Sequence, residues 1–184
     1  GAGRYIYWGV NQTTGSLLYN VNVADQNDQM AVPIGSRPLE IEFDLQTNQT
    51  YGLMSSTTTV NALASVDLST GTMTPIGSLP TVDVVSVGSS AIDSNNGRYF
   101  FIGGTISGGL RLITVDVATG NILHDPVVQT TGIDNFHFMQ YDVVSDKLYA
   151  LWSDIENTGG SSFPQYDVDL FLVEVDPVTG SFTP

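Results

Sequence analysis

The sequence contains no cysteine and a single lysine, Lys147, among its 184 residues. The absence of cysteine excludes disulfide bonds and metal sites built from thiolates. Long apolar runs are also missing, because none approaches the ~18 residues that a membrane-spanning helix needs. No long stretch has apolar residues spaced three and four positions apart, so we expect almost no α-helix.

Basic residues are scarce as a class, because five Lys and Arg stand against 19 Asp and Glu and the net charge is −14. Nucleic acids require a basic surface that neutralises phosphates, so this class of partner is excluded, as is an anionic membrane surface. Such acidity with little lysine suits an extracellular or secreted protein, a high-salt setting or calcium binding. Solubility is the simpler explanation of the charge.

The sequence does contain a short phrase that occurs four times. Apolar residues alternate with polar ones, then Val-Asp (Val-Asn in a worn first copy), two further residues and Thr-Gly follow. The alternation predicts a half-buried strand, the Asp predicts an Asx-type turn, and the Gly supplies the positive φ of a hairpin. Each copy therefore predicts a β-hairpin. The copies are Tyr5–Gly15, Leu63–Gly71, Leu110–Gly120 and Leu170–Gly180.

A second phrase alternates with the first along the chain. It consists of an apolar segment that ends in Asp, a polar turn and an aromatic strand. The copies are Ile41–Met54, Ala91–Ile102 and Gln140–Trp152. The Asp residues of this phrase, Asp44, Asp93 and Asp142, are 49 residues apart. Asp67 and Asp116 of the first phrase are also 49 apart, and two markers that share one period indicate a repeat.

A repeat of roughly 40–50 residues with four strands is typical of a β-propeller blade. We name the four strands A to D, from the apolar-Asp segment to the short strand after Thr-Gly. The sequence therefore predicts an all-β fold, with a single β-propeller domain or propeller segment over residues 1–184. Within it we expect a C–D half-blade at 4–23 and three blades at 33–79, 80–128 and 129–184.

The run Leu148-Tyr149-Ala150-Leu151, followed by the phrase Leu170–Gly180, resembles the repeats of secreted YVTN and lactonase-type propellers. The resemblance covers nearly the whole chain and implies the propeller fold. Proteins of this kind include sugar-lactone hydrolases, quinoproteins, adhesins and surface-layer repeats, so it leaves the activity open. For a lactonase-type hydrolase, it implies a divalent metal held at the central channel by carboxylate, Asn and His side chains.

In a propeller, the A–B and C–D turns lie on one face and the loops that carry ligand sites usually lie on the other. The Asp residues of both phrases fall in the first set of turns, so we interpret them as structural caps. The longest B–C loop, Ser153–Tyr166, lies on the other face, and its Phe163 and Tyr166 are candidates to stack on a sugar or grip a partner. Oxygen ligands in and beside this loop suit calcium, the one cofactor that the sequence suggests. They are Asp154, Glu156, Asn157 and Asp167.

The entrance to the central channel gathers a second set of candidates at the start of each strand A. The ligand-binding side chains expected there are Arg37, Glu40, Asp83, Asp134 and His137, with Glu42 and Asn135 beside them. The sequence has no nucleophile elbow, phosphate loop or cysteine nucleophile. We therefore expect a non-enzymatic binding, adhesion or assembly module. The alternative is a metal-dependent lactonase-type hydrolase with its site at this channel.

Two further expectations concern modification and assembly. Asn11-Gln12-Thr13 and Asn48-Gln49-Thr50 are acceptor sequences for N-glycosylation of Asn11 and Asn48, both in turns of the same face. Three and a half blades fall short of the about four to eight in natural propellers and leave apolar faces uncovered. We expect a second chain, either another copy in a homodimer or a different fragment, to complete the propeller. The other interpretation is a segment of a longer protein.

Overall fold

The computed structural model describes residues 4–11, 15–25, 27, 29–35, 38–55, 60–79, 84–105, 109–128, 135–157 and 166–183. Within these ranges the chain forms fifteen β-strands and no helix, which confirms the all-β prediction. Accordingly, the described residues include no helix long and apolar enough to cross a membrane. The strands are β1 (Arg4–Asn11), β2 (Gly15–Asn22), β3 (Gln29–Pro33), β4 (Pro38–Asp44), β5 (Gln49–Ser55), β6 (Val60–Val66), β7 (Met73–Ile76), β8 (Val84–Asp93), β9 (Arg98–Thr105), β10 (Gly109–Asp116), β11 (Ile122–His124), β12 (Asn135–Asp142), β13 (Lys147–Asn157), β14 (Tyr166–Val175) and β15 (Phe182–Thr183).

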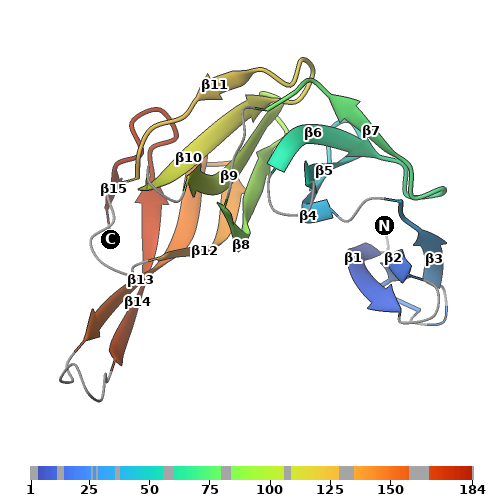
Figure 1. Ribbon diagram of the computed structural model, residues 1–184, viewed down its shortest axis with the longest axis horizontal. Coiled ribbons are helices and arrows are strands. Elements are labelled where there is room, and N and C mark those ends of the chain that lie inside the picture. The colour runs from blue at the N-terminus through green and yellow to red at the C-terminus, as the bar shows by residue number, and fades with distance from the viewer. Residues whose placement is uncertain are drawn as a thin grey trace.

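The strands form four antiparallel sheets that follow one another round an open arch (Figure 1). Three sheets have four strands each, in the orders β4-β5-β6-β7, β8-β9-β10-β11 and β12-β13-β14-β15. We call these sheets blades one, two and three. Every blade pairs its strands in chain order, A to D. The innermost strands β4, β8 and β12 contact one another and line the inside of the arch.

The first sheet has three strands, β1-β2-β3, where the sequence predicted a two-stranded C–D hairpin. The added strand β3 pairs with β2 along its whole length. A Cβ added at Gly71 would lie 2.3 Å from the carbonyl oxygen of Pro33, the last residue of β3. One added at Gly120 would lie 1.7 Å from the carbonyl oxygen of Ile76, the last residue of β7. This likeness puts β3 in the outer, D-type position, β2 in the C-type position and β1 in the B-type position.

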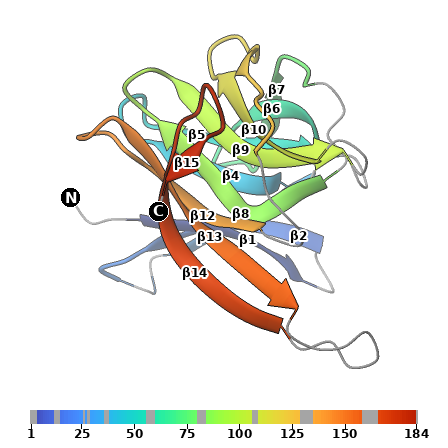
Figure 2. The same cartoon turned by 90° about the vertical axis from the view of Figure 1, so that its left-hand side faces the viewer.

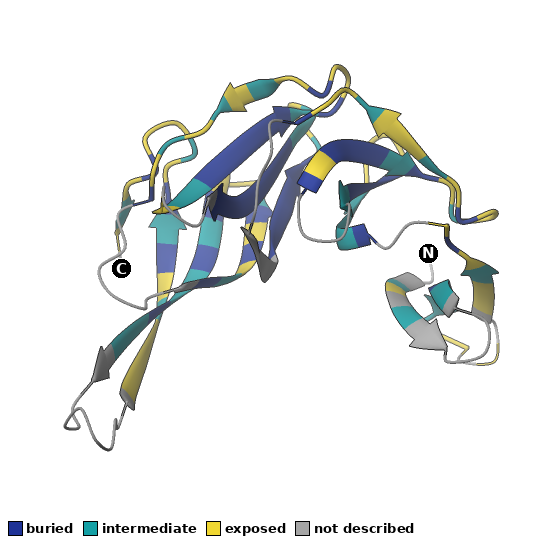
Figure 3. Ribbon diagram, viewed as in Figure 1, coloured by how far each residue is buried: buried dark blue, intermediate teal, exposed yellow. Residues whose placement is uncertain are grey.

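Each blade has two apolar faces, a leading face that packs on the preceding sheet and a trailing face that packs on the following one. Val66 and Ile41 of blade one pack on Leu18 of the first sheet. The trailing faces of blades one and two are buried against blades two and three, as the dark blue strands β9 and β10 show (Figure 3). Three positions of these trailing faces correspond between the two blades: Tyr51, Leu53 and Leu63 in blade one match Phe100, Ile102 and Leu112 in blade two. The core therefore consists of layers between successive sheets.

In the three blades, the turns fold as the Asp and Gly residues of the two phrases predicted. The first copy of the Val-Asp phrase is the exception, because its β1–β2 hairpin takes the B–C position. The predicted C–D turn at Asn11 is therefore wrong, and Asn11 and Asn48 do not lie in turns of one face. In the C–D turn of blade two, Asp116 accepts hydrogen bonds from the backbone N–H groups of Ala118 (3.1 Å) and Thr119 (2.7 Å). Gly120 then adopts a φ of 71°, and a Cβ there would clash with the preceding blade, so only glycine fits. The interpretation of these Asp residues as structural caps is confirmed.

The A–B and C–D turns lie on one face of the arch and bond to one another. Within blade two, the Val117 N–H donates to the Gly97 carbonyl oxygen at 2.9 Å. Between blades, Gln46 Nε2 donates to Asn95 Oδ1 at 2.6 Å, and Asn95 Nδ2 donates to the Val143 carbonyl oxygen at 3.2 Å. These bonds join equivalent turns of all three blades, so the repeats stack in register.

Blade three extends beyond its inner strand. The pairing of β12 with β13 reaches Asn135↔Ser153, whereas β13 and β14 stay paired as far as Asn157↔Tyr166. The ends of β13 and β14 therefore form a two-stranded ribbon that projects from the arch (Figure 1; Figure 2). Part of the segment 153–166, which the sequence predicted to be a loop, is strand, because β13 and β14 stay paired into both of its ends. Residues 158–165 lie outside the described residues.

A charged network on the turn face connects blade two to blade three. The buried carboxylate of Asp93 accepts hydrogen bonds from Asn96 Nδ2 at 2.8 Å and from Arg98 Nε at 2.7 Å. Arg98 also donates to the Tyr141 hydroxyl at 3.1 Å, and that hydroxyl donates to Asp146. Burial alone would raise the pKa of Asp93, but the bonds from Asn96 and Arg98 outweigh it and lower that pKa.

We predict that Asp93→Asn destabilises the fold by about 2–3 kcal/mol, because it leaves the Arg98 guanidinium without its buried carboxylate. Asp142→Asn, at the equivalent position of blade three, is the matched control. There the carboxylate accepts hydrogen bonds from Val144 N–H and the Ser145 hydroxyl in an exposed turn, and we expect a clearly smaller loss because water can replace these bonds. Urea denaturation at neutral pH measures both variants. Equal losses would contradict this account of the network.

Candidate functional site

The structure describes part of the predicted site. The residues outside the described ranges are Arg37, Asp83, Asp134 and Phe163. A second group of candidates lies in described strands, where the backbone of each residue is described and its side chain is not. Its members are Asn11, Asn135, Glu156, Asn157 and Tyr166. Glu40, His137, Asp154, Asp167 and Asn48 are described in full.

The inner strands β4, β8 and β12 each carry an irregularity at the same place in the repeat. The pairing with strand B shifts register between Pro38 and Ile41, between Val85 and Ser90, and between His137 and Gln140. Glu40, Ser89 and Phe138 occupy equivalent positions, 49 residues apart, inside these interruptions. β-Bulges re-aim side chains and are common beside functional sites. A carboxylate, a hydroxyl and an aromatic ring therefore stand at corresponding places on three neighbouring strands.

Phe138 has the backbone conformation that least suits its residue type. Its φ is 49°, in the left-handed region that bulky residues rarely adopt, and its side chain is 71% exposed. Phe136, two positions earlier, is fully buried, although both rings would share one face of a regular strand. The bulge therefore separates the two rings. The other described non-glycine residues with positive φ, Asn48 and Asp146, are of types that tolerate it.

Polar side chains link β12 to both of its neighbouring strands, β13 and β8, just before this bulge. The ring of His137 lies beside that of Phe138, with centroids 6.4 Å apart, and His137 Nε2 lies 3.3 Å from Ser153 Oγ on β13. From β8, the Ser89 hydroxyl donates to the Phe136 carbonyl oxygen at 2.6 Å. Residue type drew attention to His137 in the sequence but not to Phe138, because a β-bulge cannot be recognised from the alternation of a strand.

The carboxylates of Glu40 and Glu42 on β4 form the second part of the inner lining. The Ser90 hydroxyl of β8 donates to Glu42 Oε1 at 2.5 Å. Burial raises the pKa of Glu42 to about 7, the Ser90 bond opposes the rise, and the charge of Glu40 adds to it. Behind them the Tyr99 hydroxyl is buried, and burial with the charge of Glu42 raises the pKa of this phenol well above its usual value. Glu42 is therefore a carboxyl poised to change charge near neutral pH.

Asp154 and Asp167 lie on the projecting ribbon. Asp154 stands opposite Asp169 in the ladder, and Asp167 stands opposite Glu156. Acidic positions of both strands therefore share one face of the ribbon. Among the described residues, no group of three or more His, Asp or Glu side chains is arranged to hold a metal ion. Calcium binding at Asp154, Glu156 and Asp167 stays a prediction from residue type.

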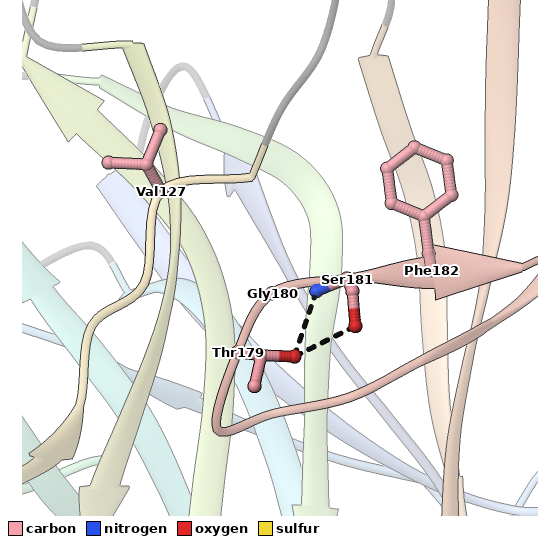
Figure 4. Close-up of a pocket in the computed structure, with 5 residues that line it drawn as sticks. All are labelled: Val127, Thr179, Gly180, Ser181 and Phe182. Atoms are coloured by element: carbon pink, nitrogen blue, oxygen red, sulfur yellow. Dashed lines mark hydrogen bonds between the residues drawn. The ribbon is translucent and has the colours of Figure 1, made fainter.

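The turn face carries Asn48 and two clefts. Asn48 is exposed in the A–B turn of blade one and borders a cleft of about 500 Å³, so its glycosylation stays a prediction at an accessible position. A smaller cleft of about 380 Å³ separates Val127 from the C–D turn of blade three (Figure 4). There the hydroxyls of Thr179 and Ser181 bond to each other at 2.8 Å. Neither cleft includes Glu40, Glu42, His137 or Phe138 of the inner lining.

We predict that the stability contributed by Glu42 depends on pH. The pKa of this carboxyl is about 7 in the fold and 4.5 ordinarily, so the fold favours the protonated form. The contribution is complete below pH 4.5 and is lost as the pH rises through 7. Glu42→Gln removes that loss, so from about pH 5 to about pH 8 the variant should gain about 2–3 kcal/mol relative to the wild type. Urea denaturation at both pH values measures this gain, and a difference that does not change with pH would contradict it.

No protein-family model matches this sequence, and no curated protein matches it in sequence. Among solved structures, the chain is similar to TolB from Acinetobacter baumannii, a β-propeller protein, with a TM-score of 0.62 and 17% identity. The similarity covers 98% of this chain and 40% of the TolB chain, so this chain spans less than half the length of that structure. At this identity the likeness shows the fold alone, and the predicted β-propeller architecture is confirmed.

Proposed function

We propose that this chain is a non-enzymatic, extracellular β-propeller module that binds a ligand or partner at its inner strands, with Phe138 at the centre of the contact. The fold does not select a function, because propellers carry many. The observation that supports the proposal is the exposed Phe138 ring, held at positive φ where β12 bulges. Because such a conformation is unfavourable for packing alone, it points to a contact with a partner.

The surroundings of Phe138 indicate the chemistry of the ligand. An aromatic ring stacks on apolar faces, while His137 and the exposed Gln140 supply hydrogen-bonding groups on the same strand. Glu40 and Glu42 add negative charge to the inner lining, and the net charge of −14 disfavours anions. The ligand that fits is uncharged or cationic and has an apolar face, as a sugar ring or a peptide side chain has. Arg37, Asp83, Asp134, Phe163 and Tyr166 stay ligand-binding candidates that rest on the sequence alone.

The distribution of carboxylates favours binding over the lactonase-type alternative. Six Asp side chains accept hydrogen bonds from backbone N–H groups in the turns, which is a structural use of six of the 19 acidic residues. They are Asp44, Asp67, Asp93, Asp116, Asp142 and Asp176. Of the side chains predicted at the channel entrance, Glu40, Glu42 and His137 are described, and β8 separates β4, which carries both carboxylates, from β12, which carries His137. The extracellular location is supported by the acidity and by the resemblance to secreted propellers.

We predict that Phe138→Gly raises stability by about 1 kcal/mol, because glycine adopts positive φ without strain and the exposed ring contributes little packing. Phe136→Ala in the same strand should instead destabilise by about 3–5 kcal/mol, because its ring is buried. Thermal denaturation measures both variants. A stability loss in Phe138→Gly would show that the ring serves the fold.

Binding is tested by ligand-observed NMR with a library of neutral sugars, short peptides and small amines. We predict hits that weaken at least ~10-fold in Phe138→Gly, because the stacking surface is lost. Val144→Ala is the control, since it removes a 91% exposed apolar side chain from the A–B turn of the same blade. Hits that survive Phe138→Gly would contradict the site. Lactone hydrolysis that depends on a divalent ion and is lost in His137→Ala would contradict the non-enzymatic assignment.

A further inference from the structure

We propose that the trailing face of blade three binds the leading face of the first sheet in a second copy of this chain, so that two copies close one ring. This contact adjoins the ligand site around Phe138, because His137 pairs with Leu151 of the trailing face and its Nε2 lies 3.3 Å from Ser153 Oγ. It concerns the two end sheets of the arch, each of which has one face that no described sheet covers (Figure 1).

The repeat supplies its own comparison for the trailing face. Leu63, Leu112 and Leu172 occupy the same position in the C strands of the three blades, three residues before Val-Asp. Leu63 and Leu112 are 0% exposed because the next blade covers them, whereas Leu172 is 65% exposed. The same residue type at the same position is therefore buried wherever a following sheet exists. What covers Leu63 and Leu112 is the leading face of another sheet, so Leu172 fits an occupant of that kind.

The exposed side chains form a continuous strip on this face. Leu172, Leu170 and Val168 alternate along β14 and stand opposite Leu151, Ser153 and Ile155 of β13, so they share one side of the sheet. The outer part of β14 is coloured as exposed in Figure 3. The charged residues beside the strip, Lys147 and Glu174, bind each other at 2.6 Å. The strip therefore offers apolar area with its flanking charges already paired.

The leading face of the first sheet is the complementary surface. Ile6, Leu18 and Val32 on one side of this sheet pack on blade one. The opposite side carries uncharged residues aligned by the strand register, namely Tyr7, Leu17, Tyr19, Val21 and Ala31. The rings of Tyr7 and Tyr19 stack with centroids 4.8 Å apart and present a flat aromatic surface. Aromatic and aliphatic side chains of this kind are enriched in the centres of interfaces.

A second copy satisfies both ends at once. Every contact between neighbouring sheets in the arch joins a trailing face to a leading face, and the described sheets leave one face of each kind uncovered. Two copies arranged head to tail make two equal interfaces and close under two-fold symmetry. The ring then has twice the four sheets of one chain, which agrees with the upper end of the about four to eight blades in natural propellers. Pairing two trailing faces would leave both first sheets uncovered.

The first experiment measures the mass of the purified chain in solution by analytical ultracentrifugation. We expect twice the 19.7 kDa of one chain, and Leu172→Glu should weaken association on the order of 30-fold or more. Leu45→Glu is the matched control, because Leu45 is 79% exposed in an A–B turn outside the proposed interface. Leu170→Glu tests the same strip independently should Leu172→Glu fail to fold. A wild-type chain that sediments as a monomer at micromolar concentration would overturn the proposal.

The second experiment tests the head-to-tail arrangement. Tyr7→Glu alters the leading face and should also give monomers. Mixing it with Leu172→Glu should restore dimers, because the pair still contains one unaltered trailing face and one unaltered leading face. Dimers that resist Tyr7→Glu, or a mixture that stays monomeric, would overturn this arrangement.

Discussion

A sheet with two apolar faces must be covered on both sides, and this requirement governs the whole structure. Leu63 lies between blades one and two, and Leu112 lies between blades two and three, each fully buried. Burying a leucine is worth about 1.5–3 kcal/mol, so each blade depends on its neighbours for much of its stability. The same requirement explains why the end sheets differ: their outer faces have the composition of interior faces but are exposed.

The repeat separates the positions that hold the fold from those that are free to vary. On the turn face, Asp93 and Gly120 occupy positions that recur in each blade, because each turn needs its cap and its left-handed residue. On the inner strands, the corresponding bulge positions hold Glu40, Ser89 and Phe138. Their residue types can differ because the recurring turn bonds do not involve these positions, although Ser89 itself donates to the Phe136 carbonyl oxygen of the next blade. This arrangement favours the inner strands as the functional surface.

Period and turn chemistry in the sequence predicted most of the fold, because the Val-Asp and Thr-Gly elements report local hydrogen bonds. The Val-Asp and Thr-Gly elements did not predict β3, which is short, ends in Pro33 and carries neither element. These elements also gave no indication of the exposed Phe138 or of the bond between Ser90 and Glu42. A bulge interrupts the alternation on which strand predictions depend, and the Ser90–Glu42 bond joins different blades. His137 was predicted as a ligand-binding residue from its residue type and stays a prediction, whereas Arg37 and Asp83 lie outside the described residues.

The central claim is that the blades stack in chain order with equivalent turns in contact, and engineered cross-linking tests it most directly. The chain has no cysteine, so a cross-link between introduced cysteines can be assigned without ambiguity. Gln46 and Asn95 are equivalent turn residues of adjacent blades whose side-chain ends lie 2.6 Å apart, and Ser145 lies in the corresponding turn one blade further on. We predict that a short bifunctional thiol reagent joins the two cysteines of the Gln46→Cys, Asn95→Cys double variant within one chain, as seen by mass spectrometry, and does not join those of the Gln46→Cys, Ser145→Cys variant. Equal cross-linking of both pairs, or cross-linking of the second pair alone, would contradict it.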